Sequence, residues 1–305
     1  MKTTRRWAAH PVRLLVLALG WAVTPHANAL YVEMFAIGDF VPGASGGCGG
    51  GDRSSWPGMA QAWYDEMGSR GHFKAGKFVD GNMTVRRFCD PTTYHANCTD
   101  FHPHVDWADA AIVATHGFDA GNRWGGSMRY PWNGACAVEA GSGSNIVRWG
   151  DSWLMFGHLS SCYSMNDNYL PGMRVAMQDT GTSSSRRAHQ LDGFHGLMWI
   201  SSSFNGNYRD TASDGHSVSV AYSWVTNHYK NNDFECAWYD PFGWAGTCRD
   251  QCPVAYSIGA SNADALVRLN HERYNWTFSD PTSNSYYAYM YYAGCHPAGK
   301  GPFNP

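Results

Sequence analysis

A histidine and a cysteine stand at corresponding places in two apolar runs of this chain. The run "ADAAIVATHG" (108–117) ends in His116 and Gly117, and the run "SWLMFGHLSSC" (152–162) ends in Cys162. A cysteine attacks as a thiolate, and a nearby histidine is its usual base. If the two runs are neighbouring strands, both side chains emerge at the same edge of a sheet. The pair therefore predicts nucleophilic chemistry by Cys162 with His116 as the base.

Small residues surround both candidate groups. Acyl transfer needs donors for the oxyanion, and backbone N–H groups in turns with small residues commonly supply them. Gly117 leaves its backbone open to close approach, and Ser161 leaves the thiol of Cys162 unobstructed. Taken singly, Cys162 fits a buried apolar side chain or half of a disulfide, and His116 fits a histidine of the core.

The chain contains nine cysteines, which is an odd number, so at least one has no partner within the chain. Cys89 and Cys98 bracket a short loop and are a plausible local disulfide. Cys295 is a candidate partner for the group Cys236, Cys248 and Cys252, while Cys48 and Cys136 lie in glycine-rich loops. Only Cys162 directly follows an apolar run that resembles a strand, so we expect it to be the free cysteine.

The N-terminus has the pattern of a secretory signal peptide. Basic residues precede the apolar run "LLVLALGWAV", and "ANA" supplies small residues at Ala27 and Ala29. We expect cleavage after Ala29 and a secreted or periplasmic protein of one domain, 30–305, with no membrane anchor after cleavage. The charged fraction is 15% and the net charge is −3, without a basic block, so nucleic acid is not an expected partner.

Strand patterns alternate with helix patterns along the mature chain, which predicts an α/β fold with a mostly parallel central sheet and helices on both faces. In such sheets ligands bind beyond the carboxyl ends of the strands. We expect three strand ends to meet there, at His116, at Cys162 and from Ser201 onward. The other predicted elements are strands at 30–37, 196–204 and 252–261, helices at 56–71, 219–232 and 262–275 with Asn262 as N-cap, and an edge or covering strand at 284–294.

The order of the two motifs resembles that of the caspase-like cysteine peptidases, a group that includes caspases, legumains, gingipains and clostripain. In that group a strand ending in His-Gly also precedes a strand ending in small residues and Cys, at a similar separation; here it is 46 residues. The resemblance covers about 105–204. The stretch "LDGFHGLMWISSSF" is also similar to uncharacterised secreted bacterial members.

The resemblance implies a caspase-like fold and a peptidase that acts on a peptide or protein substrate. Cys162 would attack the carbonyl carbon, His116 would protonate the leaving amine, and the N–H groups of Gly117 and Cys162 would hold the oxyanion. The caspase signature Q-A-C-[RQG]-G is absent, because the sequence reads "LSSCYSM". A caspase-type preference for aspartate is therefore not expected.

Other residues are candidates for the lining of the site. His158 shares a strand side with Cys162, His195 is expected to begin the next strand, and His216 is a second-choice base. Asp119 follows His116 closely.

Two kinds of metal site are compatible with other residues of the sequence. His116, Asp119, His158 and His195 could hold a metal ion, although no spacing such as H-E-x-x-H supports this. The oxygen-rich stretches "GFDAGN" and "YRDTASDG" leave structural calcium as a possibility. We otherwise expect no cofactor. The alternative to a peptidase is a non-catalytic binding or structural domain of the same fold, in which Cys162 is inert or bridged.

Overall fold

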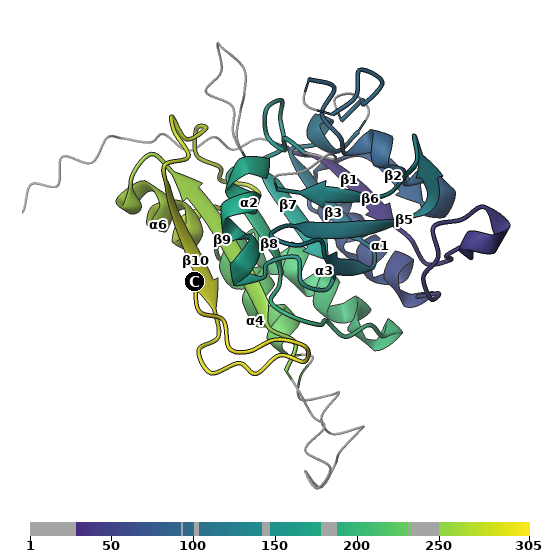
Figure 1. Cartoon of the computed structure of the whole chain (residues 1–305). Helices are drawn as coiled ribbons and strands as arrows, with labels where there is room; N and C mark the ends of the chain where they lie inside the picture. The colour runs from purple at the N-terminus through teal and green to yellow at the C-terminus, as the bar shows by residue number, and fades with distance from the viewer. Residues whose placement is uncertain are drawn as a thin grey trace, which may run out of the picture.

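The computed structural model describes residues 29–92, 94–100, 104–141, 147–177, 188–230, 232 and 250–305. Its centre is a sheet of seven strands in the order β10-β9-β8-β7-β3-β1-β2 (Figure 1). A second sheet of three strands has the order β4-β5-β6. The central strands are β1 (Tyr31–Ala36), β2 (Phe73–Val79), β3 (Ala110–Ala114), β7 (Phe156–Ser160), β8 (Gln190–Phe194), β9 (Pro253–Gly259) and β10 (Tyr286–Tyr291).

The central sheet is mostly parallel, as the sequence predicts. The strands β2, β1, β3, β7 and β8 run in one direction, while β9 is antiparallel to both β8 and β10. All residues of β3 and of β7 are buried. Continuous apolar runs of this length are typical of strands that are covered on both faces.

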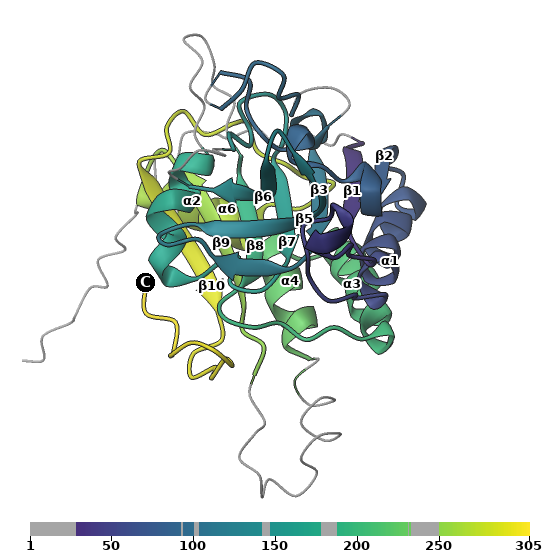
Figure 2. The ribbon, with the colours of Figure 1, turned by 45° about the vertical axis from the view of Figure 1, so that its right-hand side comes forward.

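The two faces of the sheet are covered differently (Figures 1 and 2). One face carries α1 (Ser55–Ser69), α3 (Asn205–Asp214), α4 (Val220–Tyr229) and α6 (Asn262–His271). The other carries α2 (Leu170–Ala176) and the small antiparallel sheet of β4 (Gly117–Asp119), β5 (Trp124–Trp132) and β6 (Ala135–Ala140). The small sheet begins directly after His116 and therefore lies next to the candidate site.

One predicted strand is wrong. Residues 196–204 form a loop that ends in a short 3-10 turn, Ser202–Phe204, and the strand in this region is β8 instead. The glycine at 196 has a φ of 96° and turns the chain away from the sheet. Polar Gln190 and Asp192 alternate with apolar residues in β8, although all five of its residues are buried, which concealed the strand in the sequence. His195 therefore follows a strand rather than beginning one, and no strand ends at Ser201.

The helices differ from the expectation in two details. The N-cap of α6 is Ser261, whose hydroxyl accepts a hydrogen bond from the N–H of Asp264 at 3.1 Å, whereas Asn262 is the first helical residue. The sequence also did not indicate α3, because few apolar residues mark its buried side.

Three disulfides lie within the described part of the chain. They join Cys48 to Cys136, Cys89 to Cys98, and Cys252 to Cys295. Cys236 and Cys248 lie outside the described residues, as do residues 1–28, which contain most of the predicted signal peptide. Disulfides are typical of proteins that fold in an oxidising compartment. In the described part of the chain, no helix is both long and apolar enough to cross a membrane.

Glu33 is an unusual feature of the core because it is a carboxyl group inside the sheet. The residue is fully buried in β1, and neither of its carboxyl oxygens has a hydrogen-bond partner within the described residues. Burial raises its pKa to about 9, against an opposing effect of Arg87. Glu33 is therefore protonated in the folded protein at neutral pH.

We predict that Glu33→Gln removes a pH-dependent loss of stability. In the unfolded chain Glu33 ionises above its ordinary pKa of 4.5, whereas the folded protein holds the proton until about pH 9. The free energy of unfolding of the unaltered protein therefore falls as pH rises through this window. Urea denaturation should show the variant gaining several kcal/mol relative to the unaltered protein between pH 5 and pH 8, since one pKa unit corresponds to about 1.4 kcal/mol.

The matched control is Glu66→Gln on α1, whose carboxylate pairs with Arg70 near the surface. Its difference in stability from the unaltered protein should not grow with pH in the same direction. A Glu33→Gln difference that is equal at both pH values would contradict the assignment of a buried, protonated carboxyl group.

Candidate active site

The ends of β3 and β7 bring His116 and Cys162 to neighbouring positions. The two strands pair in parallel, with Ala110 opposite Phe156 and Ala114 opposite Ser160. His116 and Cys162 each lie two positions beyond the last pair, and the two segments approach closely there, because a Cβ atom on Gly117 would overlap the carbonyl oxygen of Cys162. Both residues are partly exposed, whereas the strands that lead to them are buried. The carboxyl edge of the sheet thus carries both candidate residues, on segments that lie next to each other.

The ring of His116 is fixed by aromatic side chains and by one carbonyl group. Its centroid lies 4.8 Å from that of Phe40 and 4.9 Å from that of Trp56. Its Nε2 lies 2.7 Å from the carbonyl oxygen of Gly51, so Nε2 carries the donated proton and Nδ1 is left unprotonated in the neutral ring. Burial lowers the pKa of His116, and Arg53 lowers it further against the effect of the Gly51 bond. A neutral imidazole with a free basic nitrogen results.

Cys162 is the free cysteine among the described residues, as the sequence predicts. Its Sγ accepts a hydrogen bond from the N–H of Met198 at 3.5 Å. Burial raises the pKa of the thiol, while the Met198 bond and the positive charge of Arg53 both act to lower it. The resting residue is therefore a protonated thiol, and two groups in its surroundings favour its thiolate.

Gly117 allows the turn that carries Cys162 to lie against the small sheet. A Cβ atom at this position would overlap the carbonyl oxygen of Cys162 and the hydroxyl of Ser161. Ser161 is buried, and its hydroxyl accepts a hydrogen bond from Nε1 of Trp124 at 3.1 Å. The side chain of Ser161 thus ties the turn to β5, and only glycine fits at position 117.

The residue after Cys162 has a strained backbone. Tyr163 has a φ of 58°, which is uncommon for a residue with a side chain, and its N–H donates to the carbonyl of Gly196 at 2.7 Å. Such conformations persist where the surrounding structure enforces them, and they cluster at functional sites. The turn at Cys162 is held between the small sheet on one side and the segment that contains Gly196 on the other.

The C-terminal segment lies beside this turn. Lys300 pairs with Asp119 at 3.6 Å, and its Nζ lies 6.0 Å from the centroid of the Tyr163 ring. The N–H of Leu197 donates to the carbonyl of Ala298 at 3.0 Å. Asp119, predicted to line the site, therefore lies next to the turn, where it forms an ion pair with the C-terminal segment.

The structure places the remaining candidate histidines away from the thiol. His158 is fully buried, with Nδ1 2.9 Å from a carboxylate oxygen of Asp192 and Nε2 2.8 Å from the hydroxyl of Tyr274. His195 is also buried, and its Nε2 lies 2.8 Å from the carbonyl oxygen of Gly301. Both rings have internal partners, and these contacts make them part of the core and of the C-terminal packing.

His216 lies at the other end of the sheet. Its Nε2 is 2.8 Å from Nε2 of His72, and Nδ1 of His72 accepts a hydrogen bond from the N–H of Leu30, just before β1. Since Cys162 follows the carboxyl end of β7, the expectation of His216 as a second-choice base finds no support in this placement.

The described part of the structure gives no support to the metal sites that the sequence left open. Within the described residues, no group of three histidine, cysteine, aspartate or glutamate side chains is arranged to hold a metal ion. Most of "YRDTASDG" lies in α3, where Asp214 accepts a hydrogen bond from Asn227 at 2.9 Å. In "GFDAGN", one carboxylate oxygen of Asp119 accepts from the N–H of Gly121.

Sequence reasoning missed several residues around the thiol, namely Gly51, Arg53, Met198 and Lys300. The clearest available signal was Arg53, a single cation in the glycine-rich loop between the first predicted strand and helix. The carbonyl of Gly51 and the N–H of Met198 act through the backbone, so their residue types give no signal.

Comparison of the chain with models of known protein families, with curated proteins and with solved structures found no match.

We predict that Arg53→Gln makes the Cys162 thiol less reactive. Loss of the positive charge removes one of the groups that lower the pKa of the thiol, so the thiolate fraction at a given pH decreases. The rate of alkylation by iodoacetamide, followed by mass spectrometry from pH 6 to pH 10, should have its midpoint at higher pH in the variant. Arg209→Gln, an exposed cation on α3, is the matched control and should leave the midpoint unchanged. An unchanged midpoint in Arg53→Gln would show that its charge does not act on the thiol.

Proposed function

We propose that this protein is a cysteine-dependent amide hydrolase that acts on peptides, with Cys162 as nucleophile and His116 as general acid and base. The observation that supports this most directly is the free thiol of Cys162, which follows β7 at the same end of the sheet where His116 follows the neighbouring strand β3. A nucleophile beside a base that a third group orients is the common arrangement of such enzymes. The carbonyl of Gly51 is the orienting group here.

In the proposed reaction, the thiol of Cys162 gives its proton to Nδ1 of His116, and the thiolate attacks the carbonyl carbon of the scissile amide. The N–H groups of Gly117 and Cys162 stabilise the negative oxygen that forms. The protonated Nδ1 then gives its proton to the leaving amine. Water, deprotonated by the same nitrogen, hydrolyses the thioester and restores the thiol.

The order of the motifs favours a relationship to the caspase-like cysteine peptidases. The parallel sheet, the histidine before the cysteine and the glycine after the histidine all agree with this proposal. Together with the predicted signal peptide, the disulfides favour a secreted or periplasmic location.

A second candidate function is that of a non-catalytic binding or structural domain. The observation that favours it is the electrostatic state of the pair, because burial raises the pKa of the Cys162 thiol and lowers that of His116. Both groups are then neutral at rest, as they would also be in an inert site. Activity measurements on altered proteins separate the two functions.

We predict that Cys162→Ala and His116→Ala each abolish peptide hydrolysis. When a nucleophile and a base act as a unit, removal of either one reduces kcat by roughly 1,000-fold or more. Cleavage of a peptide library, analysed by mass spectrometry, measures this loss, and circular dichroism verifies the fold. His271→Ala, an exposed histidine on α6, should retain full activity. Hydrolysis that survives both changes at Cys162 and His116 would contradict the proposed pair, and an unaltered protein without hydrolysis of any peptide would favour the binding domain.

We also predict that Gly117→Ala strongly reduces hydrolysis while the protein remains folded. The added methyl group overlaps the turn at Cys162, and a displacement of the thiol by about 1 Å can cost about 100-fold in rate. The matched control is Gly206→Ala on α3, where no atom lies near the new methyl group, and it should leave kcat/KM unchanged. Full activity in Gly117→Ala would show that the close approach at this glycine does not position the thiol.

A further inference from the structure

A cavity lies at the amino end of the sheet, away from Cys162. It has a volume of about 470 Å³, and its lining includes Leu30, Phe73, Asp109, Met155, Thr277 and Phe278. Asp109 directly precedes β3, whereas His116 follows the same strand. The strand therefore separates this cavity from the candidate active site, and an inference about the cavity is independent of the proposed hydrolase.

Asp109 is the charged residue in the lining of the cavity. One of its carboxylate oxygens, Oδ2, accepts a hydrogen bond from the N–H of Tyr31 at 2.7 Å. Among the described residues its carboxylate makes no other hydrogen bond and no ion pair, so Oδ1 is available to a ligand. Burial raises the pKa of Asp109 to about 6, so that the group is a carboxylate at neutral pH.

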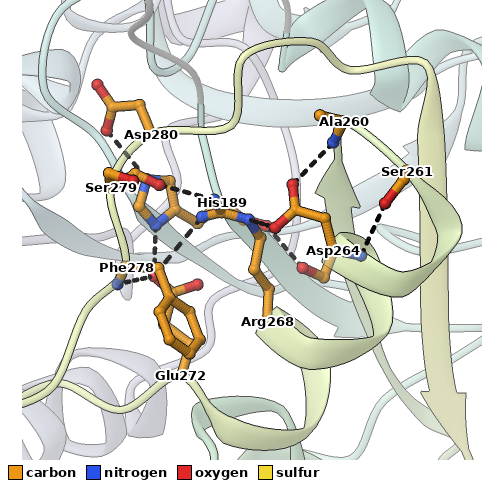
Figure 3. Close-up of polar contacts among 10 residues, drawn as sticks. His189, Ala260, Ser261, Asp264, Arg268, Glu272, Phe278, Ser279 and Asp280 are labelled. Carbon is orange, nitrogen blue, oxygen red and sulfur yellow. Dashed lines mark hydrogen bonds and ion pairs between the residues drawn. The ribbon is translucent and has the colours of Figure 1, made fainter. Parts of the chain in front are cut away.

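A network of charged side chains, centred on buried His189, Arg268 and Glu272, includes a contact with a residue of the cavity lining (Figure 3). His189 lies between two carboxylates, with Nδ1 2.6 Å from Glu272 and Nε2 3.0 Å from Asp280. Arg268 pairs with Asp264 at 3.0 Å and lies 3.9 Å from Glu272. Although burial opposes it, the two carboxylates raise the pKa of His189, which favours its protonated form.

Two residues of the lining, Phe278 and Asp109, connect the cavity to this network. The backbone N–H of Phe278, a residue of the lining, donates to Glu272 at 2.8 Å. His189 and Asp280 both act on the pKa of Asp109, His189 lowering it and Asp280 raising it. Asp109 therefore lies within electrostatic reach of the network.

The charges of this region do not balance. The carboxylates of Asp109, Asp264, Glu272 and Asp280 face the two cations His189 and Arg268. Both cations already have carboxylate partners, which leaves Asp109 without one. A partly buried carboxylate without a partner favours the binding of a cation. Since no three ligand side chains gather in the described residues, a metal ion is not the expected cation.

The side chains that form the rest of the cavity wall indicate the chemical character of the uncharged part of the ligand. Leu30, Phe73, Met155 and Phe278 present apolar surface to it. We propose that this cavity binds a small organic ammonium ion with an apolar body, whose charged group pairs with Oδ1 of Asp109 while its body packs against these side chains. A charged hydrogen bond of this kind and the burial of apolar surface together define such sites.

Isothermal titration calorimetry at pH 7.5 with 2-phenylethylamine and its uncharged counterpart 2-phenylethanol tests the proposal. The amine should bind saturably with one molecule per chain, and the alcohol at least about tenfold more weakly, since charged hydrogen bonds exceed neutral ones by this margin. Asp109→Asn, which keeps an acceptor for the N–H of Tyr31, should weaken binding of the amine by at least about tenfold. Asp210→Asn on α3 is the matched control and should bind the amine unchanged.

Absence of saturable amine binding to the unaltered protein, or equal binding of amine and alcohol, overturns the proposal. Amine binding that is unchanged in Asp109→Asn overturns the assignment to this cavity. If Asp109→Asn does not fold, the comparison of amine and alcohol on the unaltered protein decides by itself. Each outcome is independent of peptide hydrolysis, because the measurement reads heat of binding and not cleavage.

Discussion

The parallel pairing of β3 with β7 is the constraint on which the candidate site depends. Since both strands are buried on both faces, a shift of the register would break many backbone hydrogen bonds and displace buried side chains. The register from Ala110 opposite Phe156 to Ala114 opposite Ser160 therefore fixes where the polypeptide leaves the sheet after each of the two strands. The backbone positions of His116 and Cys162 at this edge follow from the pairing, and the close approach at Gly117 then constrains the turn at Cys162.

Buried polar groups on the face of β7 that the helices cover also stabilise this strand. His158 lies between the rings of Trp63 and Trp224, with Asp192 of β8 and Tyr274 as polar partners. A polar side chain in a core is tolerated when its atoms have partners, and a connected network restricts the core to one arrangement. His158 thus links two strands and two helices at a point four residues before Cys162, which makes it a structural residue of the site rather than a reactive one.

The two ends of the sheet differ in the sign of the charges around them. At the carboxyl end, Arg53 is the cation that acts on both His116 and Cys162, and it favours the thiolate while it disfavours the imidazolium. At the amino end, carboxylates outnumber cations around Asp109 and His189. The charges therefore favour an anionic thiolate at the first end and are net negative at the second. β3 connects the two, because Asp109 and His116 flank it.

The sequence by itself determined the fold class, the free cysteine and the pair of strand ends, because apolar periodicity, cysteine spacing and residue type are local properties of the chain. It predicted β1, β3, β7, β9 and β10 and the helices α1, α4 and α6 with small errors at their ends. It did not predict β2, the small sheet of β4, β5 and β6, or the helices α2 and α3. It also failed for β8, where buried Gln190 and Asp192 interrupt the apolar pattern, since burial of polar residues depends on partners from distant segments. Only the tertiary structure decided that Gly51, Arg53 and Met198 surround the pair, that His158 and His195 are internal, and that His216 lies at the opposite end. These contacts arise from residues far apart in the chain, and several act through backbone atoms, so no pattern of residue types encodes them.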